Sequence, residues 1–150
     1  MYRDSAYGYT FDYPPDLNAQ QKQERTIPPS NATGDKTLTM GGGVNIAQKD
    51  GYGIIDLSIF YNTNYVTPDD WLAEERTLFA DHGPVIEKRI MIGGQDAIVT
   101  HTDSDNEAGG LPQYEKTAVF IKDGALYKLT TRFVQDTDHE RVWNSFRFSK

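Results

Sequence analysis

Residues 114–133 read YEKTAVFIKDGALYKLTTRF and predict a β-hairpin more clearly than any other part of the chain. Two runs rich in apolar and β-branched residues, 117–121 and 126–133, favour strands. Asp123-Gly124 lies between them, and this dipeptide readily adopts the positive φ angles of a tight hairpin turn. Such a hairpin implies an antiparallel sheet.

Outside this hairpin, alternating patterns predict more strands, and helical spacing predicts two helices. The strands cover residues 7–13, 55–61, 86–92 and 95–102, with a terminal strand at Arg147-Phe148. The helices run from a cap at Thr67 to about Ala80, and from about Asp136 to Phe146. This order predicts one α+β domain over residues 1–150, with a central antiparallel sheet and helices packed on it.

Two segments have weaker signals. The polar stretch from Asp16 to Lys36 contains Pro28-Pro29 and shows neither the helical nor the strand period. It therefore predicts an irregular insertion. Gly41-Gly42-Gly43 precedes a strand-like run, and glycines in such a place indicate a bulge or a close approach of another part of the chain.

Composition excludes several classes of protein. The net charge of −7 argues against nucleic-acid binding and favours a basic protein or a cation as partner. Because the chain has no cysteine, it has no disulfide, thiolate nucleophile or cysteine-ligated metal. No apolar run reaches the length of a membrane span.

Four short motifs, spread over nearly the whole chain, point to a known family. They are the opening Tyr7-Gly8-Tyr9-Thr10-Phe11-Asp12-Tyr13-Pro14-Pro15-Asp16-Leu17, then Gly93-Gly94-Gln95-Asp96-Ala97, Lys122-Asp123-Gly124-Ala125-Leu126-Tyr127 and Trp143-Asn144-Ser145-Phe146-Arg147-Phe148. In this order the motifs resemble those of PsbP-like domains. The resemblance implies an α/β/α sandwich without conserved catalytic machinery.

The PsbP-like family includes exported bacterial lipoproteins, and some proteins of this fold are immunity proteins that block cell-wall-degrading effectors of type VI secretion. The resemblance therefore implies a periplasmic lipoprotein whose export signal and lipidated cysteine lie before Met1. Such a lipoprotein would contact the membrane only through its lipid anchor, which would have been removed from this sequence.

A cation site is one interpretation of the run from His101 to Glu107. Asp103, Asp105 and Glu107 alternate along it and could offer oxygen ligands to calcium, although the spacing does not fit an EF-hand. The alternative is a solvated loop. No two of the three histidines have the spacing of a zinc protease motif, and no nucleophile elbow is present, so no catalytic residue is predicted.

Tyrosines near predicted loops are candidate anchors for a protein partner, since a tyrosine ring is rigid and amphipathic. The candidate partner-binding residues are Tyr52, Tyr61, Tyr65 and Tyr114, together with the acidic Asp103, Asp105 and Glu107. We expect a non-enzymatic protein-binding module, most concretely an immunity-type inhibitor of a basic, secreted cell-wall hydrolase. The alternatives are a lipoprotein that binds calcium or a small molecule, and a hydrolase whose distant catalytic residues have no sequence motif.

Overall fold

The structure is a computed structural model that describes residues 1–30, 36–51, 53–61, 63–79, 83–102 and 115–149. The helices over these residues are α1 (Pro68–Leu78) and α2 (Asp136–Ser145). The strands are β1 (Tyr2–Asp4), β2 (Tyr9–Phe11), β3 (Asn18–Gln21), β4 (Arg25–Ile27), β5 (Leu38–Ala47), β6 (Gly53–Tyr61), β7 (Pro84–Ile92), β8 (Gln95–Thr102), β9 (Glu115–Lys122), β10 (Ala125–Arg132) and β11 (Arg147–Phe148). Neither described helix is long and apolar enough to cross a membrane.

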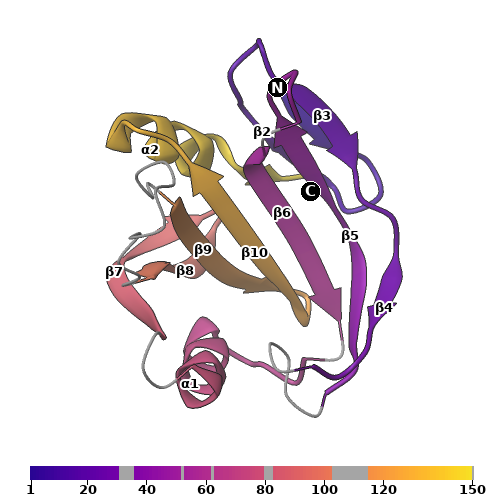
Figure 1. Cartoon of the computed structure of the whole chain (residues 1–150), viewed down its shortest axis with the longest axis vertical. Coiled ribbons are helices and arrows are strands. Elements are labelled where there is room, and N and C mark those ends of the chain that lie inside the picture. The colour runs from indigo at the N-terminus through magenta and orange to yellow at the C-terminus, as the bar shows by residue number, and fades with distance from the viewer. Residues whose placement is uncertain (31–35, 52, 62, 80–82, 103–114, 150) are drawn as a thin grey trace.

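Most strands form one antiparallel main sheet, in the order β3-β5-β6-β10-β9-β8-β7, and β4 also pairs with β5 (Figure 1). The predicted hairpin is confirmed as β9 and β10, and its turn residues Asp123 and Gly124 have φ angles of 51° and 78°. Gly93 and Gly94, with φ angles of 57° and 81°, likewise join β7 to β8. The predicted α+β class with an antiparallel sheet is therefore confirmed.

A small second sheet has the order β1-β2-β11. The aromatic strand predicted over residues 7–13 is shorter in the structure, where β2 covers only Tyr9–Phe11. The strand β1 was not predicted. The terminal strand is confirmed as β11, in which Arg147 pairs with Thr10 of β2. This sheet thus brings together segments from both halves of the chain.

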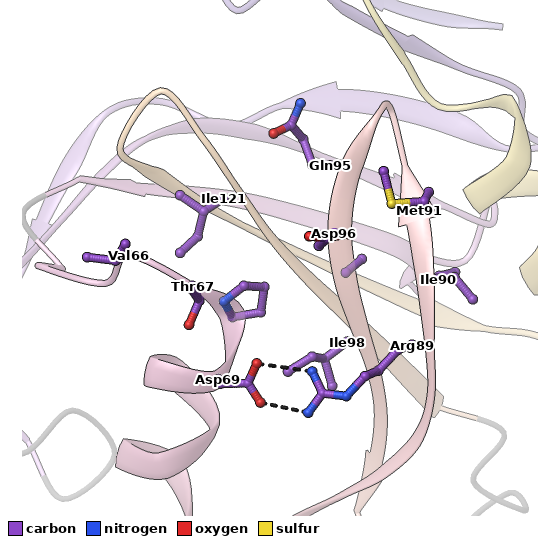
Figure 2. A pocket seen from close by; sticks show the side chains of 12 residues that line it. Val66, Thr67, Asp69, Arg89, Ile90, Met91, Gln95, Asp96, Ile98 and Ile121 are labelled. Atoms are coloured by element: carbon purple, nitrogen blue, oxygen red, sulfur yellow. Dashed lines mark hydrogen bonds and ion pairs between the residues drawn. The ribbon is translucent and has the colours of Figure 1, made fainter.

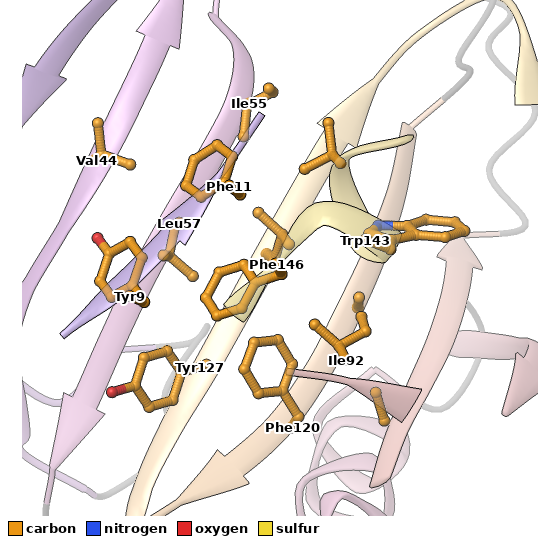
Figure 3. Packing of buried hydrophobic residues seen from close by; sticks show 14 of the residues in the cluster. Tyr9, Phe11, Val44, Ile55, Leu57, Ile92, Phe120, Tyr127, Trp143 and Phe146 are labelled. Carbon is orange, nitrogen blue, oxygen red and sulfur yellow. The ribbon is translucent and has the colours of Figure 1, made fainter. Parts of the chain in front are cut away.

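The larger hydrophobic core lies between the small sheet, α2 and one face of the main sheet (Figure 3). Phe146 is fully buried there, directly after the last residue of α2. Its ring centroid lies 5.3 Å from that of Tyr9 and 5.8 Å from that of Phe11, both in the small sheet. Phe120 of the main sheet lies 5.3 Å away. Phe146 therefore connects the two sheets.

A smaller core lies on the opposite face of the main sheet, beneath α1. Trp71 and Leu72 of the helix pack there against Ile98 and Val119, whereas the neighbouring Ala118 belongs to the larger core. This alternation is the period-two pattern expected of strands that are covered on both faces. Figure 1 shows the two helices near opposite ends of the sheet.

The segment from Asp16 to Lys36 was predicted to be irregular, and this was wrong for two parts of it. β3 and β4 lie within the segment, and both pair with β5. All four residues of β3 are exposed, as are two of the three in β4. Since neither face of β3 is buried, its sequence has no alternation of apolar and polar residues by which a strand could be recognised.

The glycines at 41–43 form the predicted irregularity in β5. The register with β6 shifts between Met40 and Gly42, as in a β-bulge. An added Cβ atom at Gly41 would meet the ring of Tyr61, and one at Gly42 would meet the ring of Tyr7. The absence of side chains at these two glycines therefore makes room for two stacked tyrosines, whose centroids are 6.3 Å apart.

Candidate functional site

Polar side chains line a part of the sheet face that carries α1 and that no other helix or strand of the described residues covers. They project from the central strands and include Asp56, Ser58, Thr117, Lys128, Thr130 and Arg132. Each alternates with core residues of the other face, such as Leu57 and Leu129. With Trp71 and Glu75 of α1, these side chains enclose a hollow of about 490 Å³.

Two more hollows adjoin this one, and Phe60 lines all three. One of about 580 Å³ extends across β5 to residues 20–25. The other, of about 180 Å³, shares Trp71, Glu75 and Lys128 with the first. We call the two larger hollows the sheet groove and the smallest the side cavity.

Lys22 anchors one end of the sheet groove. Its ammonium group donates to Asp56 Oδ1 and to Ser58 Oγ, both at 2.7 Å. Asn45 Nδ2 donates to the other carboxylate oxygen of Asp56 at 3.1 Å. The Lys22 side chain is only 19% exposed, so solvent screens this ion pair less than a pair on the open surface. Lys22 and Asn45, each donating to one carboxylate oxygen, hold the Asp56 carboxylate in one position.

Arg132 has the same role at the other end of the groove. Its Nε donates to Glu115 Oε2 at 2.8 Å, and its Nη1 donates to the carbonyl oxygen of Gly53 at 3.3 Å. The two ionic side chains are about one-third exposed. The groove is therefore bordered by charges that neutralise each other and by side chains whose positions are already fixed.

Lys128 and Glu75 face the middle of the groove without a direct ion pair among the described residues. The Lys128 ammonium lies 6.0 Å from the centroid of the Trp71 ring, near the limit of a cation–π contact. Burial raises the pKa of the Glu75 carboxyl, while the charge of Lys128 lowers it. Of the charged side chains that line the 490 Å³ hollow, Asp56, Glu115 and Arg132 are held in ion pairs among the described residues, whereas Glu75 and Lys128 are not.

A separate hollow of about 560 Å³ lies between the first turn of α1 and the β7–β8 hairpin (Figure 2). Arg89 donates to both carboxylate oxygens of Asp69 across it, at 2.7 and 3.0 Å. These hydrogen bonds lower the pKa of Asp69. Both side chains are more than half exposed, so we interpret the pair as a surface contact between helix and hairpin, of small energetic weight.

Most of the predicted partner-binding residues lie outside the described residues. These are Tyr52, Asp103, Asp105, Glu107 and Tyr114, which include all three predicted calcium ligands. Among the residues that the structure describes, no group of three acidic, histidine or cysteine side chains is close enough to hold a metal ion.

The two remaining tyrosines do not form one patch. Tyr61 stacks on Tyr7 and is 37% exposed, and it follows Ile59 on the face of the larger core. Tyr65 packs against the smaller core on the opposite face, and its hydroxyl donates to Glu74 Oε2 at 2.8 Å. Burial and this hydrogen bond raise the pKa of the Tyr65 phenol. Only Tyr65, which lines the side cavity, borders the candidate site.

His139 has a structural role in α2. Its Nε2–H donates to the carbonyl oxygen of Phe133 at 2.9 Å, so Nδ1 is the acceptor for the Thr131 hydroxyl at 2.7 Å. The residue is 1% exposed. Burial lowers the pKa of this imidazole, so the folded chain holds it in the neutral form.

Replacing His139 with glutamine is expected to flatten the pH dependence of stability between about pH 6.5 and pH 5. In the unfolded chain this imidazole binds a proton near pH 6.5, but in the folded chain it does so only at lower pH. Wild-type stability therefore falls as the pH falls through this window, by up to about 1.4 kcal/mol per pH unit. Urea unfolding at several pH values measures both slopes, and equal slopes for the two proteins would contradict the assignment.

Sequence reasoning missed the groove, although part of its signal was present. In β6 and β10 the residues opposite the core are polar, as in Asp56-Leu57-Ser58 and Lys128-Leu129-Thr130. A polar face in the middle of a sheet that also carries a helix indicates an uncovered surface. Lys22, however, comes from the segment that was predicted to be irregular.

No protein-family model matches this chain, and searches of curated proteins and of solved structures also found no match.

Proposed function

We propose that this chain is a non-enzymatic protein-binding module that holds its partner across the sheet groove. The observation that carries the proposal is the groove itself, an elongated polar surface over the central strands with Phe60 and Trp71 beside it. Its ion pairs fix the bordering side chains before binding, and such preorganisation reduces the entropy lost on association.

The described chemistry of the groove favours binding over catalysis. Lys22 is paired with Asp56 and Arg132 with Glu115, so these groups neutralise each other. Outside the groove, Thr131 and His139 are joined by a hydrogen bond between a hydroxyl and an imidazole. In some enzymes this arrangement activates a nucleophile. Both residues are buried, at 0% and 1% exposure, out of reach of a substrate.

Most concretely, we propose an immunity-type inhibitor that blocks a secreted cell-wall-degrading effector in the periplasm. The PsbP-like resemblance of the motifs at both ends of the chain supports this assignment. The net charge of −7 favours a basic effector, because opposite charges accelerate encounter between the two proteins. A calcium-binding role rests on Asp103, Asp105 and Glu107 alone, outside the described residues.

Substitution of Thr117 with tryptophan is expected to weaken binding of the effector at least tenfold, or about 1.4 kcal/mol. Thr117 is half-buried in the groove, where its hydroxyl contacts that of Thr130 at 3.1 Å. A tryptophan ring there occupies space that the partner needs. The assay tests whether the neighbouring gene encodes a cell-wall hydrolase and, with that purified enzyme, measures both binding and inhibition of peptidoglycan cleavage.

Thr77→Trp is the matched control, because Thr77 is exposed on α1 and lines none of the hollows described above. It should bind and inhibit as the wild type does. Equal inhibition by the Thr117 and Thr77 variants would remove the groove from the interface. If the neighbouring gene encodes no hydrolase and a native periplasmic extract yields no saturable partner, the immunity function is wrong.

A further inference from the structure

The 490 Å³ hollow of the sheet groove contains two opposite charges that have no ion-pair partner among the described residues. Glu75 projects into it from α1 and Lys128 from β10, and both side chains are half-buried. The other charged side chains that line this hollow belong to the ion pairs at its two ends. Glu75 and Lys128 are therefore the two charges that a ligand could neutralise.

The Glu75 carboxylate has lost part of its hydration without a full replacement. Burial is the largest influence on this carboxyl and raises its pKa, and the positive charge of Lys128 offsets only part of the effect. The neighbouring Glu74 raises the pKa further. A charge in such surroundings is unfavourable until a group of opposite charge replaces the lost water. A cationic group beside Glu75 would supply that replacement.

The two charges together disfavour a ligand that carries a single charge. Lys128 repels a cation that approaches Glu75, and Glu75 repels an anion that approaches Lys128. A neutral ligand forms no ion pair with either side chain. A zwitterion with its ammonium group at Glu75 and its carboxylate at Lys128 gains both attractions. The charge pattern of the hollow therefore favours a zwitterion.

The apolar walls of the hollow indicate an apolar group on the same ligand. Phe60, Trp71, Phe79 and Pro84 also line the hollow, and the Trp71 ring centroid lies 6.0 Å from the Lys128 ammonium. A volume of about 490 Å³ is within the range of small-molecule sites. An α-amino acid with an apolar side chain combines an ammonium group, a carboxylate and an apolar group in one small molecule.

We propose that this hollow binds a free α-amino acid with an apolar side chain, whose ammonium group pairs with Glu75 and whose carboxylate pairs with Lys128. This activity goes beyond the proposed function, because it requires no second protein. Since the hollow is part of the sheet groove, a bound amino acid occupies space that the proposed partner needs.

The experiment compares three compounds by isothermal titration calorimetry. They are L-leucine, N-acetyl-L-leucine, which lacks the ammonium group, and L-leucinamide, which lacks the carboxylate. We expect each blocked compound to bind the wild type at least about tenfold more weakly than leucine, since each loses one charge-assisted hydrogen bond.

Glu75→Gln and Lys128→Gln identify which side chain meets which group of the ligand. In E75Q the preference for leucine over N-acetyl-leucine should be largely lost, while the preference over leucinamide remains. K128Q should show the reverse. A variant that had only lost stability would bind all three compounds more weakly, so these selective changes report direct contact.

Glu140→Gln and Arg141→Gln are the matched controls, because both residues are exposed on α2 and line none of the hollows described above. They should keep all three affinities. The proposal is overturned if leucine shows no saturable binding at millimolar concentration, or if E75Q and K128Q leave both preferences unchanged. These titrations contain no effector, so their outcome is independent of the inhibition assay with the hydrolase.

Discussion

Gly43→Ala is expected to destabilise the fold by about 4 kcal/mol or more, which places it among the most damaging single substitutions. Gly43 lies in β5 with a φ angle of 140°, a conformation that side chains rarely adopt. An added Cβ atom would lie 2.0 Å from the backbone carbonyl oxygen of Leu57 in the paired strand. Since backbone forms this contact, relief requires β5 and β6 to separate. Denaturant unfolding measures the effect.

Gly51→Ala provides the matched control for this substitution. Gly51 also has a positive φ angle, 88°, but no atom lies within 4 Å of the position that its Cβ would take. The free energy of unfolding of Gly51→Ala should therefore fall by only about 1–2 kcal/mol, the conformational cost of placing an alanine in the left-handed region. A similar loss in the two variants would mean that the approach of β6 to Gly43 is looser than the structure has it.

The second large effect is expected for Phe146→Ala, at about 3–5 kcal/mol. The Phe146 ring is fully buried and contacts rings from both sheets, including Tyr9 and Phe120. Its removal leaves a cavity at the point where the sheets meet, and the stacked rings around it have little freedom to close that space. Urea unfolding, followed by tyrosine and tryptophan fluorescence, gives the free energy of unfolding.

Phe146→Leu separates volume from the aromatic contacts, because leucine fills much of the same space. We expect it to cost clearly less than the alanine variant, about 1.5 kcal/mol. If Phe146→Ala lost no more than this, Phe146 would not be the main connection between the small sheet and the main sheet.

Local signals were sufficient to predict the centre of the fold. The Asp123-Gly124 and Gly93-Gly94 turns need positive φ angles that few residue pairs accept, and both were located from sequence. The start of α1 was equally clear, and Asp70 accepts hydrogen bonds there from the backbone N–H groups of Val66 and Thr67. Each of these features is determined by residues that are close together in the sequence.

Features that depend on distant residues could not be predicted in the same way. The strand β3 has no buried side and therefore no periodic sequence pattern. The groove depends on contacts between residues that are far apart in the sequence. Lys22 pairs with Asp56, and Arg132 with Glu115, only when the sheet has brought their strands together. Tyr61 and Tyr65 are close in sequence, yet the strand end and the loop direct them to opposite faces of the sheet.

The pairing of β2 with β11 has a consequence for folding kinetics. Thr10 and Arg147 are partners across nearly the entire chain, whereas the hairpins β7–β8 and β9–β10 close over two-residue turns. Long loops lose more entropy on closure than short ones, and folds rich in such distant contacts fold slowly. We therefore expect the hairpins to form early and the search for the β2–β11 pairing to limit the folding rate, with Phe146 packed between the sheets only in the final step.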